Sequence, residues 1–512
     1  MRTLALLLLL APGLAAAETP IEIASAHRQE HGARIISEYA ELLRIPNVAS
    51  DSVNLRRNAV FLTELFREHG AEMEMLQVEG AVPLVTGRLD TPGASRTLGI
   101  YVHYDGQPVD ESRWPQSPWE PTVYTQDIDN GGVPRAFPAA GEEIDPEWRL
   151  YARAAGDDKS PFPALLNALD ALREAGVGLT SNLVFLFEGE EESGSEHLSD
   201  YLEEFRDKFE ADVWLICDGP LHQSRKPQLV FGVRGFTSME ITVYGASRSL
   251  HSGHYGNWSP NPAMMLSQLL AGMKDDDGNV EIIGFYESSE PIGEAERQAL
   301  ATIPDIDAAL MRGLDLARTE GGGASLSEQI LKPSLNIRGL ASGNVGDLAR
   351  NVIPQKATAS IDIRLVKGND PEIMLDLVEE HIQRQGYFIV REDPDRATRR
   401  THPRIAKVTR ATSGYVAART RMDHPIVPLL AEAAGLASGG EEVILTPSMG
   451  GSLPLYLFNE ILERPVVIVP IANHDDNQHA PNENLRIANL WYGSDLMAAV
   501  LTMPAEASDG GE

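Results

Sequence analysis

Four short apolar runs, each followed by a histidine or a carboxylate, constrain the fold of this chain more than any other feature. The runs cover residues 97–103, 183–187, 213–217 and 465–471, and segments with helical periodicity, such as residues 162–175, fall between them. Short apolar strands that alternate with helices are typical of a parallel sheet covered by helices on both faces. We therefore predict an α/β domain built on a doubly wound, mostly parallel sheet.

A second domain is predicted from a change of pattern near residue 232. The chain has 512 residues, which is long for one compact domain. Residues 237–243 and 356–366 alternate apolar and polar side chains, which indicates half-buried antiparallel strands. We therefore expect an α+β domain inserted into the α/β domain. The predicted segments are 18–231 for the first part of the α/β domain, 232–420 for the inserted domain and 421–505 for the second part.

The N-terminus reads MRTLALLLLLAPGLAAAETP and indicates a signal peptide at residues 1–17. Arg2 supplies a positive start, an apolar stretch follows, and three alanines precede the expected cleavage site. The apolar stretch is short for a membrane anchor, because a spanning helix needs about 20 apolar residues. We therefore expect export to the periplasm or to the exterior of the cell.

The charge of the chain limits its partners. The formal net charge is −32, from 43 Lys and Arg against 75 Asp and Glu. Nucleic acid and anionic membranes repel such a surface, so we expect neither as a partner. The chain has one cysteine, Cys217, so no disulfide within the chain can form, and its apolar neighbours predict a place in the core.

Groups that can bind a metal follow the ends of the apolar runs. The first run ends in His103, and the other three are followed by the acidic segment 188–192, Asp218 and the segment 473–479, while a loop carries the pair 157–158. A single acid after a strand is explained by capping of the next helix, but four such ends together favour a site at the carboxyl edge of the sheet. Imidazole and carboxylate suit zinc, with manganese or cobalt as further options. Five such ligands fit two metal ions that share one carboxylate.

Eight motifs, in one order along residues 35–500, resemble the carnosinase-like dinuclear zinc metallopeptidases. Relatives of that family include acetylornithine deacetylase, succinyl-diaminopimelate desuccinylase and bacterial carboxypeptidases. The motifs are HYDGQPVD at 103–110, DDK at 157–159, EGEEESGS at 188–195, LHSG at 250–253, RNVIPQKA at 350–357, IRLV at 363–366, GGSLP at 450–454 and HAPNE at 479–483. The resemblance implies that the inserted domain serves as a lid and in dimerisation.

The resemblance also implies a role for each metal ligand. His103 and Asp218 would hold one Zn²⁺, Glu192 and His479 would hold the second, and Asp157 would bridge them. Mn²⁺ or Co²⁺ could replace Zn²⁺ in such a site. The alternatives to His479 lie in the same segment and are His474, Asp475 and Asp476.

Two further carboxylates complete the expected catalytic group. Asp105 would orient the His103 ring, and Glu191 would be the general base that takes a proton from the attacking water. The remaining acids of the second run, Glu188 and Glu190, are expected to be solvated or to cap a helix. Asp158 is expected to orient the loop rather than to bind metal.

The later motifs implicate a second set of residues. His251 resembles the family histidine that stabilises the oxyanion from a dimer partner, and Arg364 resembles the arginine that binds a substrate carboxylate. Asn351, Gly451 and Ser452 are expected to contact the substrate. From the residues alone, His251 could equally be a surface histidine, and Arg364 could simply pair with Asp362.

The chain departs from the family pattern in the loop before the aspartates. Arg153-Ala154-Ala155-Gly156 replaces a more glycine-rich stretch, and Ser160 stands where glycine is common. These changes concern the shape of the pocket rather than the ligands.

The resemblance implies an exported zinc-dependent dipeptidase or short-peptide carboxypeptidase that cuts the amide bond next to a C-terminal carboxylate. The expected partners are a small peptide with a free C-terminal carboxylate and a second copy of the chain. Two alternatives stay open. One is an N-acyl amino acid amidohydrolase with the same metals, and the other is a non-catalytic binding protein on the same fold.

Overall fold

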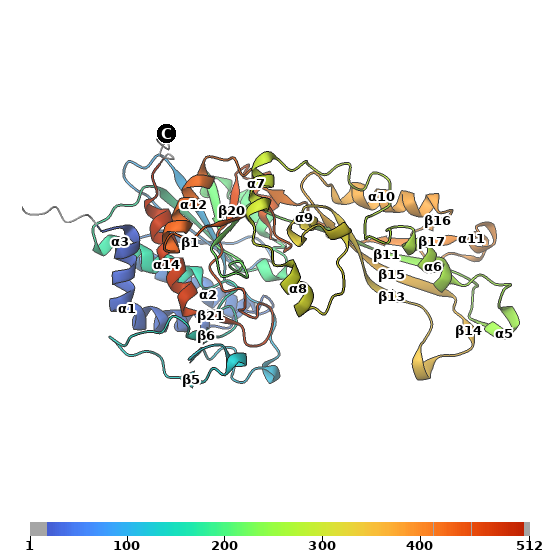
Figure 1. Cartoon of the computed structure of the whole chain (residues 1–512), viewed down its shortest axis with the longest axis horizontal. Coiled ribbons are helices and arrows are strands. Elements are labelled where there is room, and N and C mark those ends of the chain that lie inside the picture. Colours follow the sequence, from blue (N-terminus) through green and yellow to red (C-terminus); the bar gives the residue numbers. More distant parts are fainter. Residues whose placement is uncertain (1–17, 413, 452, 506–512) are drawn as a thin grey trace, which may run out of the picture.

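The computed structural model describes residues 18–412, 414–451 and 453–505, arranged as two units side by side (Figure 1). The predicted signal peptide, residues 1–17, lies outside the described residues. One unit contains the large sheet and both ends of the described chain, and the other is the inserted domain. In this part of the chain, no helix has the length and apolar character that crossing a membrane requires.

The large sheet has eight strands in the order β1-β2-β7-β3-β8-β20-β9-β19. The four apolar runs form its centre, where β7, β3, β8 and β20 are neighbours and all pair in parallel. The predicted parallel sheet is confirmed, while β1 and β2 at one edge are antiparallel. The strands are β1 (Glu72–Leu76), β2 (Leu84–Leu89), β3 (Thr97–His103), β7 (Asn182–Glu188), β8 (Val213–Ile216), β9 (Gln228–Val230), β19 (Ile444–Thr446) and β20 (Val466–Ile468).

Helices cover both faces of this sheet, as a doubly wound fold requires. Alternate side chains of β3 enter different cores: Ile100 and Val102 pack with the helices of one face, and Tyr101 packs with those of the other. Cys217 is buried and unpaired, as predicted. The first face carries α1 (Pro20–Leu43), α2 (Ser52–Glu68), α3 (Pro161–Glu174), α12 (Ile426–Ala437) and α14 (Ile487–Thr502), and the second carries α4 (Leu198–Glu204) and α13 (Leu455–Glu460).

A four-stranded sheet in the order β21-β6-β4-β5 joins distant parts of the chain. The segment that reads as a surface insertion, residues 111–147, supplies two of its strands. β21 pairs with β6 through Asn484 and Tyr151, which brings the chain after His479 beside the loop that carries Asp157. The strands are β4 (Thr122–Tyr124), β5 (Pro134–Arg135), β6 (Arg149–Tyr151) and β21 (Asn484–Arg486).

The inserted domain is built on a five-stranded sheet in the order β13-β15-β11-β17-β16. The two alternating segments form its centre, where β11 and β15 pair antiparallel over their whole length. Helices α6 and α10 pack against this sheet and close a separate core. The elements are β11 (Gly235–Tyr244), β13 (Ser334–Ala341), β15 (Lys356–Leu365), β16 (Phe388–Val390), β17 (Ile405–Arg410), α6 (Pro262–Ala271) and α10 (Pro371–Arg384).

Short elements connect the two units and form the tip of the inserted domain. Strands β10 (Gly232–Val233) and β18 (Ala418–Arg419) pair where the chain enters and leaves this domain. The α+β character of the domain is confirmed, and its limits at 232 and 420 stay a prediction. The other elements are β12 (Leu250–His251), α5 (Ser252–Tyr255), α7 (Glu294–Thr302), α8 (Asp307–Gly313), α9 (Leu326–Ile330), β14 (Val352–Ile353) and α11 (Arg396–Thr401).

Candidate metal centre

The ends of the central strands bring the predicted ligands together. His103 is the last residue of β3 and is in register with Glu188, the last residue of the parallel neighbour β7. Asp218 follows β8, and the segment that contains His479 follows β20. Because all four strands run in the same direction, these side chains meet at one edge of the sheet, where α/β folds bind ligands.

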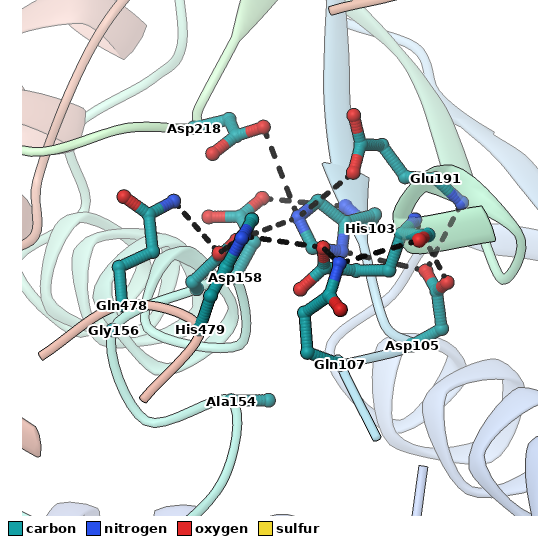
Figure 2. A network of polar contacts seen from close by, with 12 residues as sticks. His103, Asp105, Gln107, Ala154, Gly156, Asp158, Glu191, Asp218, Gln478 and His479 are labelled. Carbon is teal, nitrogen blue, oxygen red and sulfur yellow. Dashed lines mark hydrogen bonds and ion pairs between the residues drawn. The ribbon is translucent and has the colours of Figure 1, made fainter. Parts of the chain in front are cut away.

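His103 lies at the centre of the cluster (Figure 2). The side chain of His103 is completely buried, and its Nε2 is 2.9 Å from Oδ1 of Asp157 and 3.8 Å from Oδ2 of Asp218. The same nitrogen is 4.0 Å from Oε2 of Glu191. On the other side of the ring, Nδ1 is 3.4 Å from Oδ1 of Asp105. This arrangement turns Nε2 toward the carboxylates and places Asp105 where it can fix the ring.

The carboxylate of Asp157 spans two groups of ligands. Its Oδ1 faces Nε2 of His103, and its Oδ2 is 3.0 Å from Nε2 of His479. His479 is also 3.3 Å from Oε2 of Glu192. One carboxylate with an oxygen on each side is the arrangement that a ligand shared by two metal ions requires.

At this edge of the sheet, two sets of ligand atoms are close enough to hold metal ions. His103, Asp158 and Asp218 form one set, Asp157, Glu192 and His479 form the other, and the ligand atoms within each set lie within 4.8 Å of one another. The first set includes Asp158, which we predicted to orient the loop rather than to bind metal. Oδ2 of Asp158 also accepts a hydrogen bond from the backbone N–H of His103 at 3.3 Å, so this side chain does position the strand end. A cis peptide bond joins Asp157 and Asp158.

Asp105 also fixes the segment that carries Glu191 and Glu192. Its two oxygens accept hydrogen bonds from the backbone N–H groups of Glu191 at 3.2 Å and Glu192 at 3.0 Å. Gln107 donates a hydrogen bond from Nε2 to Oε2 of Glu192 at 2.8 Å. Glu191 and Glu192 are therefore held by residues that follow His103 along the chain.

The other two acids of this segment are structural. The prediction that Glu188 is solvated or caps a helix is wrong, because this residue ends β7, is buried and accepts a hydrogen bond from the Tyr101 hydroxyl at 2.6 Å. Glu190 accepts a hydrogen bond from the backbone N–H of Val82 at 3.2 Å and contacts the His197 ring. Neither belongs to the two sets of candidate ligands.

A buried carboxylate, Glu483, holds the loop that presents Asp157. Glu483 accepts hydrogen bonds from three backbone N–H groups, those of Ala154, Gly156 and Asp157, at 3.0, 3.1 and 3.0 Å. It also pairs with the buried guanidinium of Arg153 at 2.6 Å. Ala154, in the stretch that departs from the family pattern, has a φ of 62°, a left-handed conformation that glycine adopts more readily.

Lys159, which follows the two aspartates, points away from them. Its buried Nζ donates hydrogen bonds to Oδ1 of Asn58 at 2.7 Å and to the carbonyl oxygen of Leu42 at 3.2 Å. Burial lowers the pKa of the lysine to about 7. This lysine therefore fixes the loop to α1 and α2 and does not neutralise the carboxylates of the cluster.

The electrostatics of the cluster favour a bound cation. Burial raises the pKa of Asp218 to about 7 and also raises the pKa of Glu191. Hydrogen bonds with Asp157 and Glu192 raise the pKa of His479 to about 10. The cluster contains more carboxylates than histidines and is largely buried. Divalent cations would therefore relieve the repulsion among the carboxylates. Imidazole nitrogen and carboxylate oxygen are the donors that Zn²⁺ takes, so the residues present fit the predicted metals.

The alternative ligands in the segment of His479 make other contacts or lie outside the candidate sets. Asp475 pairs with Arg149 at 2.6 Å and with Arg486 at 2.9 Å, and both arginines are buried. Asp476 accepts a hydrogen bond from the backbone N–H of Gln478 at 3.0 Å. His474 is not part of either set of candidate ligands. Geometry therefore selects His479 from this segment.

Within one chain, the structure does not bring His251 or Asn351 to the cluster. His251 ends β12, is exposed, and pairs with Val352 of β14, next to Asn351. Figure 1 shows β14 and α5, which flank these residues, at the tip of the inserted domain that is farthest from the large sheet. Any action of His251 on a metal cluster therefore requires another molecule.

Arg364 lies on β15, near the base of the inserted domain. Its Nε is 3.6 Å from Oδ2 of Asp362, so the predicted ion pair is present, and its guanidinium lies over the Phe236 ring at 5.2 Å. Arg234 is close by: burial first, and then the charge of Arg364, lower the pKa of Arg234 to about 10. Two arginines near each other are a setting that a carboxylate ligand suits.

The loop predicted to contact the substrate joins these arginines to the cluster. The backbone N–H of Arg234 donates a hydrogen bond to the carbonyl oxygen of Gly451 at 3.3 Å. In the same loop, Met449 lies against Gly219, the residue that follows Asp218. Ser452, the other residue predicted here, lies outside the described residues.

Four residues at the site are not singled out by the sequence patterns. They are Gln107, Arg234, Gln478 and Glu483. Gln478 donates a hydrogen bond from Nε2 to Oδ2 of Asp157 at 2.7 Å, beside His479. Gln107 and Glu483 belong to the motifs HYDGQPVD and HAPNE, so their position in these motifs is the signal that could have identified them. Arg234, between Val233 and Gly235, carries a weaker signal.

Comparison with known proteins gives a family match and several relatives. The model of Peptidase family M20/M25/M40 matches residues 99–503. The Cys-Gly metallodipeptidase dug1 of Schizosaccharomyces pombe is 27% identical over 497 residues, and the alignment covers 92% of this chain and 96% of the relative. The Beta-Ala-His dipeptidase of Homo sapiens is 27% identical over 474 residues, covering 90% of this chain and 84% of the relative.

Solved structures of other proteins share the fold of this chain. The M20 family metallo-carboxypeptidase Sso-CP2 from Sulfolobus solfataricus aligns with a TM-score of 0.71 at 26% identity, covering 92% of this chain and 98% of that one. Human carnosine dipeptidase 1 aligns with a TM-score of 0.65 at 23% identity, covering 94% of this chain and 98% of that one. The likeness covers both the large-sheet unit and the inserted domain.

Proposed function

Because the chain belongs to peptidase family M20/M25/M40 and is therefore a metallopeptidase that hydrolyses peptide bonds, we propose that it is an exported dipeptidase with two metal ions. The curated relatives above are named for the dipeptides Cys-Gly and beta-Ala-His. Those names favour a short peptide with a free C-terminal carboxylate as substrate. Export is supported by the signal-like sequence of residues 1–17.

The position of Asp157 between His103 and His479 is the observation that carries the two-metal proposal. Its oxygens lie 2.9 Å and 3.0 Å from the two imidazole nitrogens, on opposite sides of one carboxylate. Asp218 would complete one metal site, and Glu192 the other. Zn²⁺ suits these donors, and Mn²⁺ or Co²⁺ are the other candidates. When bound, two such ions would lower the pKa of a shared water and polarise the scissile carbonyl.

Glu191 is the residue best placed to move protons in this reaction. Its carboxylate lies 4.0 Å from Nε2 of His103, and its backbone is fixed by Asp105. The carboxylate takes a proton from the attacking water and delivers it to the nitrogen of the leaving amine. Asp105 acts through other residues, because it lies 3.4 Å from Nδ1 of His103 and accepts a hydrogen bond from the backbone N–H of Glu191.

The substrate carboxylate is proposed to bind near Arg364 and Arg234. Arg364 is close to Arg234, whose backbone is hydrogen-bonded to Gly451, and the loop of Gly451 reaches the residue after Asp218. A peptide whose scissile carbonyl sits at the metal cluster would extend its C-terminus along this loop. Guanidinium groups bind carboxylates through paired N–H donors, which gives both affinity and orientation. Ser452, in the same loop, is proposed as a further contact.

A homodimer is proposed because His251 and Asn351 are far from the cluster of their own chain. His251 of the partner subunit would donate a hydrogen bond to the developing oxyanion, and Asn351 of the partner subunit would lie beside it. Exposed apolar side chains on β13 and in the segment that follows it support an interface on this face of the inserted domain. They are Ile337, Leu340, Val345, Leu348 and Val352.

Replacing Glu191 by glutamine tests the proposed reaction. The Glu191→Gln variant should retain its metals and lose about 10²–10⁴-fold in kcat on dipeptides, since it cannot accept a proton. Metal content is measured on the same samples as the rate of hydrolysis. Asp200→Gln is the control, because this carboxylate is exposed and lies in α4, outside the cluster. Hydrolysis at the wild-type rate by the Glu191 variant would refute the mechanism.

The N-acyl amino acid amidohydrolase is the weaker alternative, because the curated relatives reported above are dipeptidases. Rates on a panel of dipeptides, compared with N-acetyl and N-succinyl amino acids, separate the two activities. The proposal predicts higher kcat/KM on dipeptides.

A further inference from the structure

We propose that helices α1 and α3 carry an additional site for a divalent transition metal of the zinc type, formed by His27, His31 and Glu174. The Oε2 atom of Glu174 is 3.5 Å from Nε2 of His27 and 4.0 Å from Nε2 of His31. The three ligand atoms lie within 4.8 Å of one another. None of these residues belongs to the metal cluster at the edge of the sheet.

The sequence places both histidines on one face of α1. Residues four positions apart in a helix lie one above the other, and the two imidazole rings are 4.5 Å apart between centroids. Glu174 is the last residue of α3, which packs against α1 in the same core. Figure 1 shows the two helices together at the end of the molecule opposite the inserted domain.

His27 is oriented as a metal ligand would be. It is only 7% exposed, and its Nδ1 lies 2.7 Å from Oδ1 of Asn167 on α3. A contact this short with an amide oxygen places a proton on Nδ1, so in the neutral ring Nε2 carries the lone pair. Among the described residues, Nε2 has no hydrogen-bond partner although it is buried. A histidine held through one nitrogen, with the other directed at further donors, is the usual arrangement around protein-bound zinc.

The distances are close to those that zinc would impose. With bonds of about 2.0–2.2 Å in a tetrahedral site, ligand atoms lie about 3.3 Å apart. The separations of 3.5 and 4.0 Å therefore need only small side-chain rotations. Two imidazoles exclude Mg²⁺ and Ca²⁺ as preferred ions, since these prefer oxygen donors.

The site is open to solvent on one side. The side chains of His31 and Glu174 are 29% and 57% exposed, while His27 is buried beneath them. A metal can therefore enter from the surface and keep water as its fourth ligand. Because its ligands come from two helices, the ion would fasten α1 to α3. We infer a stabilising site and assign it no role in hydrolysis.

Counting metal ions in paired variants tests this site. The wild type, His31→Gln and Glu174→Gln are stripped with a chelator, reloaded with Zn²⁺ and freed of excess metal, and zinc per chain is measured by mass spectrometry. Each variant should bind one zinc fewer than the wild type, whatever the number held by the cluster at the sheet edge. His402→Gln, which removes a half-buried histidine of the inserted domain, should match the wild type. Equal zinc content in all four proteins would overturn the proposal.

Two further measurements separate a metal site from a histidine–glutamate ion pair. Zn²⁺ should raise the melting temperature of the wild type more than that of His31→Gln, and peptidase activity at saturating Zn²⁺ should be the same in both. Asn167→Ala should weaken binding at this site about 10–100-fold, because His27 loses the group that orients it. A zinc-dependent rise in melting temperature that is identical in the wild type and in His31→Gln would contradict the site.

Discussion

Oε1 of Glu483 accepts a hydrogen bond from the backbone N–H of Asp157 at 3.0 Å. The two residues are far apart in the sequence, and both are buried. The contact fixes the backbone of the residue whose side chain spans the two sets of candidate ligands. The position of Asp157 therefore depends on a carboxylate that touches no ligand atom in either set.

Replacing Glu483 by glutamine should weaken metal binding about 10–100-fold, the range seen when residues that orient ligands are changed. The amide can accept fewer of the three backbone hydrogen bonds and leaves the buried Arg153 without its ion pair. Competition with a chromophoric chelator measures the affinity. Glu441→Gln, at an exposed position, is the control. Wild-type affinity in the Glu483 variant would show that the loop does not need this contact.

Mixing two inactive variants should restore activity if His251 acts on a neighbouring subunit. His251→Ala and Glu191→Gln are each expected to be poorly active, and subunits exchanged between them form mixed dimers. In a mixed dimer, one of the two sites combines Glu191 of its own subunit with His251 of the partner subunit. About a quarter of all sites should therefore recover activity. Activity is measured before and after exchange. No recovery in a mixture that light scattering shows to contain dimers would contradict the assignment.

Replacing Arg364 by methionine should reduce kcat/KM for dipeptides about 10–100-fold, as expected for loss of a charged hydrogen bond worth about 1.5–3 kcal/mol. Dipeptide amides, which lack the terminal carboxylate, should be much less affected. Arg338→Met is a close control, because Arg338 also lies over the Phe236 ring, at 5.8 Å. An equal loss on both classes of substrate would mean that Arg364 does not bind the carboxylate.

The stability of the inserted domain should depend on pH through Glu379. Burial alone would raise the pKa of this carboxyl, but hydrogen bonds from Arg391 and Arg410, at 2.7 Å, outweigh burial and hold the pKa below its usual value. A lowered folded pKa contributes stability above the unfolded pKa of about 4.3, and the contribution is lost as pH falls through the folded pKa.

We therefore expect Glu379→Gln to lower the free energy of unfolding by about 1.5–3 kcal/mol at pH 7, with the difference shrinking below about pH 4. Urea unfolding of both proteins at pH 7 and at pH 3.5 measures the change. Glu380→Gln, which alters the adjacent exposed carboxylate, should have little effect at either pH. A difference that does not vary with pH would rule out the titration of Glu379 as its cause.

The large sheet could be predicted because its four central strands are buried on both faces and appear as apolar runs in the sequence. The same runs located the edge of the sheet where the candidate ligands meet, since parallel strands end at one edge, whereas the choice among the acids and histidines there came from the family resemblance. Short strands such as β6 and β21 could not be predicted, because their pairing joins residues near 150 with residues near 485. A strand of three residues is too short for its apolar–polar pattern to indicate which distant segment it pairs with.

The structural roles of two buried acids were also not predicted from the sequence. Glu188 and Glu483 are both acids in polar segments, yet one accepts a bond from Tyr101 and the other holds a loop. Whether these acids are buried depends on which distant segments pack together in the fold, and the local sequence does not indicate this packing. Figure 1 places α5 and β14, which flank His251, at the far tip of the inserted domain, and the role of His251 on another subunit stays a prediction.

The pairing of β21 with β6 has a consequence for the order in which the enzyme is assembled. During synthesis, His103, Asp157, Glu192 and Asp218 emerge long before His479 and Glu483. Until the last strand has docked, the loop of Asp157 lacks its anchor and the second set of ligands lacks its histidine. We therefore expect a nascent or C-terminally truncated chain to bind metal poorly, so that metal loading would follow completion of the chain.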